Sequence, residues 1–407
     1  MAETESHRLL LAIVTLGLVV RLLYVLGYPQ QPVMRDEEGY DKTAMALVST
    51  GAYQMSGRVP LYPTFLAAIY VTVGHSYPAV RAAQAVIVAL TALVAFFLAR
   101  AVFAGRYGLV AAGLVSFHPG FIAYSGLLLT ETVLGLLLAL FVWCAVQAHG
   151  RGGFGWAVSS GVTLGLAALC RFEIVGILVP VAAWLAWRRR SARGLQESLL
   201  FLVVATLAVA PWSVRQYASR DQNVALNGGM GATVWLSTYP GDWLEWYPDR
   251  EPLRSLMDCN CSARELDRRL MQAAVRNLID FPGRYAQMSA KRFARFWIGS
   301  HSYVVRGLEP SFGQAIGDRD VAVVAVKGLL LILNVGLLGL AAVGSYTERA
   351  TWEAWFPLIL VIAFINSVHV LLFSTSRYQI PIMPLVLVLA APAVYHLVVG
   401  RQARKVT

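Results

Sequence analysis

The charged side chains best placed for chemistry stand beside long apolar segments. Three acidic residues in succession, Asp36, Glu37 and Glu38, lie in the segment Met34–Tyr40, shortly after the apolar segment Leu9–Leu26. Carboxylates close to hydrocarbon are costly unless water solvates them or the protein uses them. This segment is therefore either an ordinary polar loop or a site at which a carboxylate accepts a proton.

A cation and a second carboxylate accompany these acids. Arg58 opens the sequence Arg58-Val-Pro-Leu-Tyr-Pro63 at the end of the same polar stretch, and Glu131 follows Thr130 near one end of a later apolar segment. A guanidinium can donate two parallel hydrogen bonds to phosphate oxygens, so Arg58 is a candidate phosphate contact. Glu131 fits either a site or a simple interaction with the positive end of a helix dipole.

Two more arginines stand at the ends of apolar segments farther along the chain. Arg171 and Glu173 fit either a phosphate contact with a supporting acid or a plain ion pair at a helix turn, because charges at a membrane edge usually find partners. Arg377 fits either a phosphate contact or an interfacial anchor. His369, inside an apolar segment, is predicted to be structural.

The elements that must position these residues are membrane-spanning helices. The chain has 407 residues, of which 57% are hydrophobic and only 14% are charged, whereas a soluble domain carries about 25% charged residues. Apolar segments near the roughly 20 residues needed to cross a bilayer recur from end to end. The sequence therefore predicts an all-α, polytopic membrane protein. The net charge of +11 does not indicate nucleic acid, because the arginines are not gathered with aromatic residues on one face.

Ten crossings are predicted, at residues 9–26, 78–100, 107–124, 127–147, 154–170, 172–187, 196–214, 322–343, 354–373 and 379–399. The apolar segment Leu61–Gly74 is too short to cross and is expected to lie on the membrane. This arrangement places most arginines of the short connections on one side, as the positive-inside rule requires. We therefore expect both termini in the cytoplasm of a bacterial inner membrane, with residues 28–77 and 216–320 outside.

The large outer segment, 216–320, carries two further features. Its stretch 282–297 mixes arginine and lysine with aromatic residues, a pattern that favours a helix lying in the headgroup layer. Cys259 and Cys261 form a C-x-C pair with no other cysteine or histidine nearby. A strained local disulfide or a metal site is the less favoured interpretation of that pair.

Five short motifs, all predicted to face outward, resemble those of the GT-C superfamily of membrane glycosyltransferases. They are Asp36-Glu37 with Gly39-Tyr40, Arg58-x-Pro-Leu-Tyr62, Thr130-Glu131, Arg171-Phe-Glu173 and Arg377-Tyr378. Their order is similar to that in the branch of protein O-mannosyltransferases and aminoarabinose transferases, and the resemblance runs from Leu9 to Leu397. It implies a GT-C fold with one transmembrane domain over residues 1–407 and the catalytic motif within residues 28–77.

By this resemblance the chain is an inverting glycosyltransferase that takes a sugar from a polyprenyl-phosphate donor. The acceptor would be a glycan, a lipid or a protein at the outer face. Asp36 is implied as the base for the acceptor hydroxyl, with Glu37 orienting it or the acceptor. Arg58, Arg171 and Arg377 are implied as contacts for the donor phosphate. The implied substrate-binding or supporting residues are Tyr40, Tyr62, Glu131, Glu173 and Tyr378.

The resemblance implies no firm cofactor. Some relatives carry a glutamate that helps to hold a metal directly before the phosphate-contacting cation, and this chain has Gly57 there. Dependence on a divalent metal is therefore not firmly expected. The alternative from another class is a transporter or flippase of a lipid-linked or anionic substrate. Transporters place charges at mid-membrane beside paired broken helices, whereas the charges here stand at span ends, which favours the enzyme.

Overall fold

The computed structural model describes residues 2–27, 35–53, 58–103, 105, 107–189, 192–218, 230–241, 253–258, 261–298 and 311–403. In these residues the regular elements are all helices. Seven are long and apolar enough to cross a membrane, and the last includes the short helix η4 (Ser376–Ile382) ahead of α18. The seven are α1 (Ala2–Leu26), α4 (Tyr77–Val102), α7 (Glu131–Gly150), α10 (Ala192–Ala218), α16 (Val321–Thr347), α17 (Trp352–Leu371) and α18 (Met383–Ala403). The chain is a multi-pass membrane protein, as predicted.

An eighth span is broken. The expected crossing 107–124 forms two helices, α5 (Gly108–Phe117) and α6 (Pro119–Ser125), bent by 49°. Pro119 causes the break, because the residue before a proline avoids the α conformation, and His118 has the extended ψ of 121°. Arg21 of α1 donates to the freed carbonyl oxygens of Val115 (3.2 Å) and Ser116 (2.6 Å). The break is therefore a built feature of the bundle.

Three shorter apolar helical segments complete the set. Two of them, α8 (Phe154–Cys170) and η1 (Phe172–Ile177) continuing into α9 (Leu178–Arg189), coincide with the expected crossings 154–170 and 172–187. The third, α3 (Leu61–Val73), is the segment expected to lie on the membrane. All ten expected crossings thus coincide with apolar helices or a helix pair, although the number that cross stays a prediction.

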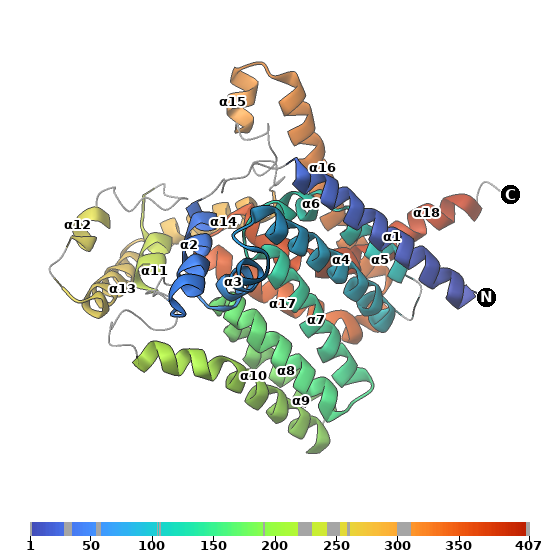
Figure 1. The fold of residues 1–407 in the computed structure, drawn as a ribbon, viewed down its shortest axis with the longest axis horizontal. Coiled ribbons are helices and arrows are strands. Elements are labelled where there is room, and N and C mark those ends of the chain that lie inside the picture. The colour runs from blue at the N-terminus through green and yellow to red at the C-terminus, as the bar shows by residue number, and fades with distance from the viewer. Residues whose placement is uncertain are drawn as a thin grey trace.

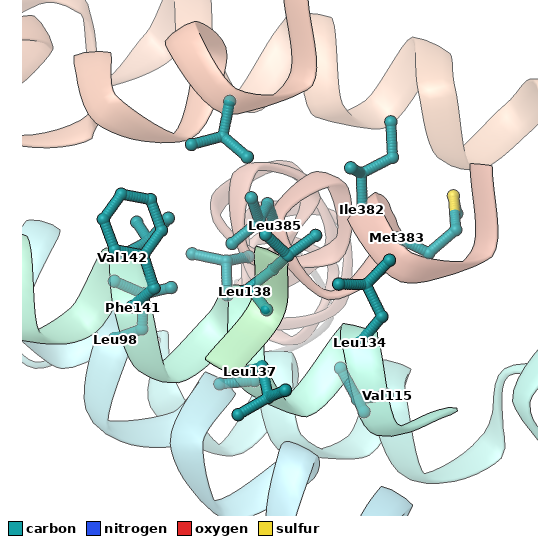
Figure 2. Close-up of a cluster of buried hydrophobic side chains, with 14 of the residues drawn as sticks. Leu98, Val115, Leu134, Leu137, Leu138, Phe141, Val142, Ile382, Met383 and Leu385 are labelled. Atoms are coloured by element: carbon teal, nitrogen blue, oxygen red, sulfur yellow. The ribbon is translucent and has the colours of Figure 1, made fainter. Parts of the chain in front are cut away.

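The core is apolar side chains packed between α4, α5, α7 and α18. Figure 2 shows Leu98 of α4, Leu138 of α7 and Leu385 of α18 meeting in one cluster, and none of the three is accessible to solvent. Lipid is as apolar as these side chains, so close packing and satisfied polar groups must hold the helices together. The ends of these core helices then carry the polar groups described below.

The two ends of the molecule differ in content. Figure 1 shows the N-terminus of α1 and the C-terminus of α18 at one end, and α2 (Arg35–Thr50), α11 (Gly231–Thr238), α12 (Leu253–Met257) and α13 (Ala263–Asp280) toward the other. Termini at the same end require an even number of crossings. The loop helices thus lie opposite the termini, as the topology prediction requires, whereas the orientation in a membrane stays a prediction.

The segment expected to lie in the headgroup layer is helical over α14 (Pro282–Trp297). One of its faces is buried in the protein. Arg292 is only 3% exposed and donates to the carbonyl oxygen of Ser237 (2.5 Å), and Gln379 of η4 donates to the carbonyl oxygen of Phe296 (2.9 Å). Besides any contact with lipid, α14 therefore supports the elements that carry Arg377 and Tyr378. The short helix α15 (Phe312–Gly317) precedes α16 and projects from the rest in Figure 1.

The helix α2 is fixed to α3 and α4 by one buried carboxylate. Asp41 accepts hydrogen bonds from the hydroxyls of Tyr70 (2.6 Å) and Tyr77 (2.9 Å) and from Nε2 of His75 (2.8 Å). Asp41 is 9% exposed. Hydrogen bonds to an ionised group are among the stronger ones in proteins, so this cluster sets the position of the acidic first turn of α2.

Candidate active site

Five segments that are distant in the sequence meet beside the first turn of α2. They are α2 itself, the residues that lead into α3, the start of α7, the turn between α8 and η1, and η4. Each contributes at least one charged side chain to a continuous set of ion pairs. The set contains every charged residue that the motifs singled out except Glu37, which lies next to it on α2. The sequence motifs thus converge in space.

Asp36 occupies the solvent-accessible end of this network. Its carboxylate accepts from Nη1 of Arg377 (2.7 Å) and from Nη2 of Arg58 (3.4 Å), and its side chain is 49% exposed. Partial burial raises the pKa of Asp36, but the charges and hydrogen bonds of Arg377 and Arg58 outweigh that effect and hold the pKa below its ordinary value. Asp36 is therefore ionised at neutral pH and open to a second reactant.

Glu131 forms the buried centre of the network. It is the first residue of α7, its side chain is fully buried, and its Oε1 pairs with Nε of Arg377. The same oxygen lies 3.9 Å from Nη1 of Arg171, whose Nε is paired with Glu173 at 2.7 Å. The ion pair between Arg171 and Glu173 that the sequence left open is thus present, and it also belongs to the larger network. A buried charge with no partner would be strongly destabilising, so these pairs are mutually required.

Glu37 faces a different part of the molecule from Asp36. Its side chain is fully buried and accepts from the backbone N–H of Leu128 (2.7 Å). Residues 127–130 were expected to be helical and are not, since α7 begins only at Glu131. Glu37 and Gln84 satisfy polar groups of that irregular segment, because Gln84 donates to the carbonyl oxygens of Ser125 (3.1 Å) and Leu127 (2.7 Å). Glu37 therefore holds the segment that positions Glu131.

Arg58 lies in an aromatic cradle. Its guanidinium stacks over the ring of Tyr40 at 4.2 Å, and Tyr40 in turn meets Tyr62 edge-on at 4.9 Å. Tyr62 is fully buried and donates to Oε1 of Gln84 (2.9 Å). A Cβ at Gly39 would lie 2.8 Å from Cζ of Arg58, so the missing side chain lets the guanidinium reach Asp36. The motif residues Gly39, Tyr40 and Tyr62 thus serve the placement of Arg58.

Tyr378 occupies the opposite end of the network. Its ring lies between the guanidinium of Arg171 (4.3 Å) and the imidazole of His369 (4.2 Å, interplanar angle 12°). His369 is the final-turn histidine of α17, and its Nε2 lies 3.9 Å from Glu173. His369 and Gln84 are site residues that no sequence motif indicated. A histidine in an apolar segment and a glutamine inside a spanning helix were the only signals available for them.

A metal site was not firmly expected. Among the residues that the structure describes, no group of three or more histidine, cysteine, aspartate or glutamate side chains is arranged to hold a metal ion. Asp36, Glu131 and Glu173 are each paired with arginine instead. Gly57, on which the metal question rests, and Cys259 lie outside the described residues. Cys261 is described and is disulfide-bonded, so the prediction that disfavoured a disulfide at this cysteine is wrong.

The chain is similar to known proteins both in sequence and in fold. Residues 58–215 match the family model described as dolichyl-phosphate-mannose-protein mannosyltransferase. The fold is similar to the Archaeoglobus fulgidus oligosaccharyltransferase in complex with zinc and sulfate, with a TM-score of 0.54, 14% identity and coverage of 96% of this chain and 50% of the other. The sequence match shows a similarity to this family, and the likeness to the oligosaccharyltransferase shows a fold of the GT-C type. The resemblance to the mannosyltransferase branch and the expected GT-C fold are thus confirmed.

Two further structures extend this comparison. The A. fulgidus oligosaccharyltransferase AglB in complex with an inhibitory peptide and a dolichol-phosphate has a TM-score of 0.54 at 13% identity, covering 97% of this chain and 52% of that one. ArnT from Cupriavidus metallidurans in the apo state has a TM-score of 0.44 at 14% identity, covering 98% of this chain and 78% of that one. No curated protein is significantly similar in sequence. This chain spans about half the length of the archaeal oligosaccharyltransferases.

Proposed function

We propose that this GT-C protein transfers a sugar from a polyprenyl-phosphate donor to an acceptor hydroxyl, with inversion at the sugar carbon. The observation that carries the proposal is Asp36, an ionised and half-exposed carboxylate paired with Arg58 and with Arg377, which connects it to the rest of the network. A base and a cation next to each other are the two groups that this reaction needs, because phosphate is already a good leaving group. The family match over residues 58–215 supports the same reaction class.

The reaction is a single displacement. The acceptor oxygen loses its proton to Asp36 and attacks the anomeric carbon, and the bond from that carbon to the phosphate oxygen breaks. The electron pair leaves with the phosphate, whose added charge a guanidinium stabilises. In-line displacement places the attacking oxygen and the departing phosphate on opposite faces of the sugar carbon. Asp36 and the phosphate therefore approach the sugar carbon from opposite sides.

Arg58 is the arginine that is freest to change partners. Its only ion pair in the network is the long 3.4 Å contact with Asp36, and its side chain is 23% exposed. Arg171 is held by Glu173 at 2.7 Å, and Arg377 is held by Asp36 at 2.7 Å and by Glu131. The three carboxylates balance the three arginines, so an incoming phosphodiester must replace a carboxylate. We infer that the donor phosphate takes Arg58 from Asp36, with Arg377 as the second contact.

The proposed location follows from the charge pattern. Cytoplasmic termini would place α2, α11 and the network at the periplasmic or extracellular side, where a lipid-linked donor is accessible. A protein of the same fold, AglB of A. fulgidus, has been solved with a dolichol-phosphate, which supports a lipid phosphate as the carrier. The acceptor would be a glycan, a lipid or a protein.

The test is the release of polyprenyl phosphate by the full-length protein in liposomes. A panel of undecaprenyl-phosphate monosaccharides serves as the donor, and a membrane glycolipid extract serves as the acceptor. Asp36→Asn is expected to lose about 10²–10⁴-fold in rate, because the amide cannot accept a proton. Glu38→Gln is the matched control: it removes the same charge from the same helix turn, at an exposed side chain whose ion pair among the described residues is with Lys42.

Two outcomes contradict the proposal. Asp36→Asn that still transfers sugar at more than about a tenth of the wild-type rate is incompatible with a base. Movement of the donor across the bilayer with its sugar–phosphate bond intact would instead identify a transporter.

A further inference from the structure

A cavity of about 330 Å³ lies beside the end of the network that carries Arg171. Its walls are the turn 171–173, the helix α11, the last turn of α17 and Tyr378. Neither Asp36 nor Arg58 is among its lining residues. The cavity is thus separate from the proposed base, although Arg171 and Glu173 belong to both the network and the cavity wall.

Several polar groups in the wall of this cavity can form further hydrogen bonds. The hydroxyls of Tyr378 and Thr233 have no hydrogen-bond partner among the residues that the structure describes. His369 donates from Nδ1 to the carbonyl oxygen of Phe373 (3.1 Å), so the neutral ring keeps its lone pair on Nε2. That Nε2 lies 3.9 Å from Glu173, too far for a hydrogen bond. A ligand with both donors and acceptors would satisfy these groups.

The rest of the wall is aromatic and apolar. Phe172, Phe373 and the ring of Tyr378 line the cavity together with aliphatic side chains of α11 and α17. The Tyr378 ring is fixed between Arg171 and His369, which fixes the direction of its hydroxyl. Apolar walls with a few convergent polar groups are typical of small-molecule sites, and this volume is at the small end of their range.

The wall of the cavity does not suit two parts of a lipid-phosphate donor, namely its phosphate and its prenyl chain. A phosphate would meet the Glu173 carboxylate and the lone pair of His369, and the Arg171 guanidinium that could attract it is already held by Glu173 at 2.7 Å. A prenyl chain would leave the polar groups of the wall unsatisfied, which is costly for a buried donor or acceptor. A sugar ring suits both kinds of wall, because its hydroxyls donate and accept while its C–H faces pack on aromatic rings.

We propose that this cavity binds one neutral monosaccharide ring, with the Tyr378 and Thr233 hydroxyls and Nε2 of His369 as its hydrogen-bond partners. The inference rests on the proposed function for the origin of the ring. That origin is either the glycosyl group of the donor or a residue of an acceptor glycan, and both present the same chemistry to the cavity.

The test uses the purified full-length protein in lipid nanodiscs and two kinds of probe. Binding of free D-mannose, D-glucose and L-arabinose is measured by saturation-transfer NMR, and binding of undecaprenyl phosphate, with and without a sugar, is measured separately. Tyr378→Phe and Thr233→Val remove one hydroxyl each while keeping the shape of the side chain. Tyr217→Phe, at a tyrosine that is 89% exposed on α10, is the matched control.

We expect Tyr378→Phe and Thr233→Val to weaken binding of the best monosaccharide by about threefold to tenfold, the usual effect of one lost hydrogen bond. Tyr217→Phe and the affinity for undecaprenyl phosphate should not change. If the extra affinity that a sugar gives to the lipid phosphate is also lost, the ring belongs to the donor. If that extra affinity persists while binding of free sugar is lost, the ring belongs to the acceptor.

Three results would overturn the inference. Wild-type protein that binds none of the sugars has no monosaccharide site, and equal binding by wild type and both cavity variants places the sugar elsewhere. Weaker binding of sugar-free undecaprenyl phosphate in the cavity variants would place the phosphate in the cavity. None of these results touches the role of Asp36, which the transfer assay with Asp36→Asn tests by itself.

Discussion

Asp36 and Asp41 lie on the same helix, α2, in opposite surroundings. Asp36 is half-exposed, and its partners are the charged side chains of Arg58 and Arg377, which lie 22 and 341 residues away in the sequence. Asp41 is buried, and two tyrosines and a histidine from the adjoining α3–α4 region hydrogen-bond to it. In the proposed reaction Asp36 exchanges its partners for a substrate, whereas the buried Asp41 keeps its partners.

On the proposed function, one helix carries both the reactive acid, Asp36, and a structural acid, Asp41. A guanidinium that pairs with Asp36 gives up little when a phosphate replaces that carboxylate, because charge pairing is retained. The hydroxyls around Asp41 would be left buried and unsatisfied by a similar exchange, which is costly. Because the cluster at Asp41 holds α2 in place, the ion pairs of Asp36 at the start of the helix are not needed to position it.

The largest expected effect on stability belongs to Asp41. We expect Asp41→Asn to lower the free energy of unfolding by about 3 kcal/mol, because hydrogen bonds to a charged group are lost and the amide NH₂ faces a donor. Thermal unfolding of the purified protein in detergent measures it.

Asp36→Asn provides the contrast in the same assay. Its unfolding midpoint should stay close to that of the wild type, since Asp36 is half-exposed and the buried Arg377 keeps Glu131 as a partner. Equal destabilisation by the two substitutions would remove the distinction between the two acids.

The sequence indicated most of the charged residues of the candidate site but not their arrangement. The motifs around Asp36, Arg58, Glu131 and Arg377 indicated functional charges, and these side chains do meet in the structure. Asp36 and Glu37 are adjacent in the same motif, yet a helix turns by about 100° per residue, so one faces solvent and the other the interior. Which of the two faces inward depends on α3, α4 and the segment 127–130, and no local pattern encodes that packing.

The cavity and the start of α7 could not be predicted from the sequence, because both depend on tertiary packing. Thr233 and His369 come from helices with no motif of their own, and they acquire a shared role only because α11 packs near the end of α17. The expected crossing 127–147 began too early, because apolar composition cannot show that Glu37 and Gln84 bind the backbone of residues 127–130. Tertiary contacts override local preference at such positions.

The next prediction concerns the cation beside Asp36. Arg58→Ala should raise the donor KM by roughly 10- to 150-fold, corresponding to about 1.5–3 kcal/mol for a charged phosphate contact. Arg58→Lys should lose less, because lysine keeps the charge without the bidentate fork. Steady-state kinetics with a polyprenyl-phosphate sugar measures both. A donor KM unchanged by Arg58→Ala would exclude Arg58 from the phosphate site.

The pH profile of the same variant is a second measurement of the pair. Arg377 and Arg58 hold the pKa of Asp36 below its ordinary value, so the base stays ionised, and its ion pairs persist, until the pH falls through that lowered pKa. The acid limb of kcat/KM is thus expected below about pH 4, the ordinary range of an aspartate. Arg58→Ala removes one of the two cations, and the acid limb should move to higher pH. A limb that stays in place would show that Arg58 does not act on Asp36.

The smallest expected effect is that of Gly39→Ala, and it separates the placement of Arg58 from its chemistry. The new methyl group would lie 2.8 Å from Cζ of Arg58, so the end of that flexible side chain must move away from Asp36. The fold itself should not suffer, because alanine in a helix is favoured over glycine by about 0.5–1 kcal/mol. We expect an unchanged or slightly higher unfolding midpoint together with a donor KM raised by less than Arg58→Ala raises it. Gly328→Ala on α16, where the added methyl meets nothing within 4 Å, is the control for the helix effect alone. A Gly39→Ala protein with the donor KM of the wild type would mean that Arg58 reaches the phosphate from another position, and the contact with Asp36 would then have no part in binding.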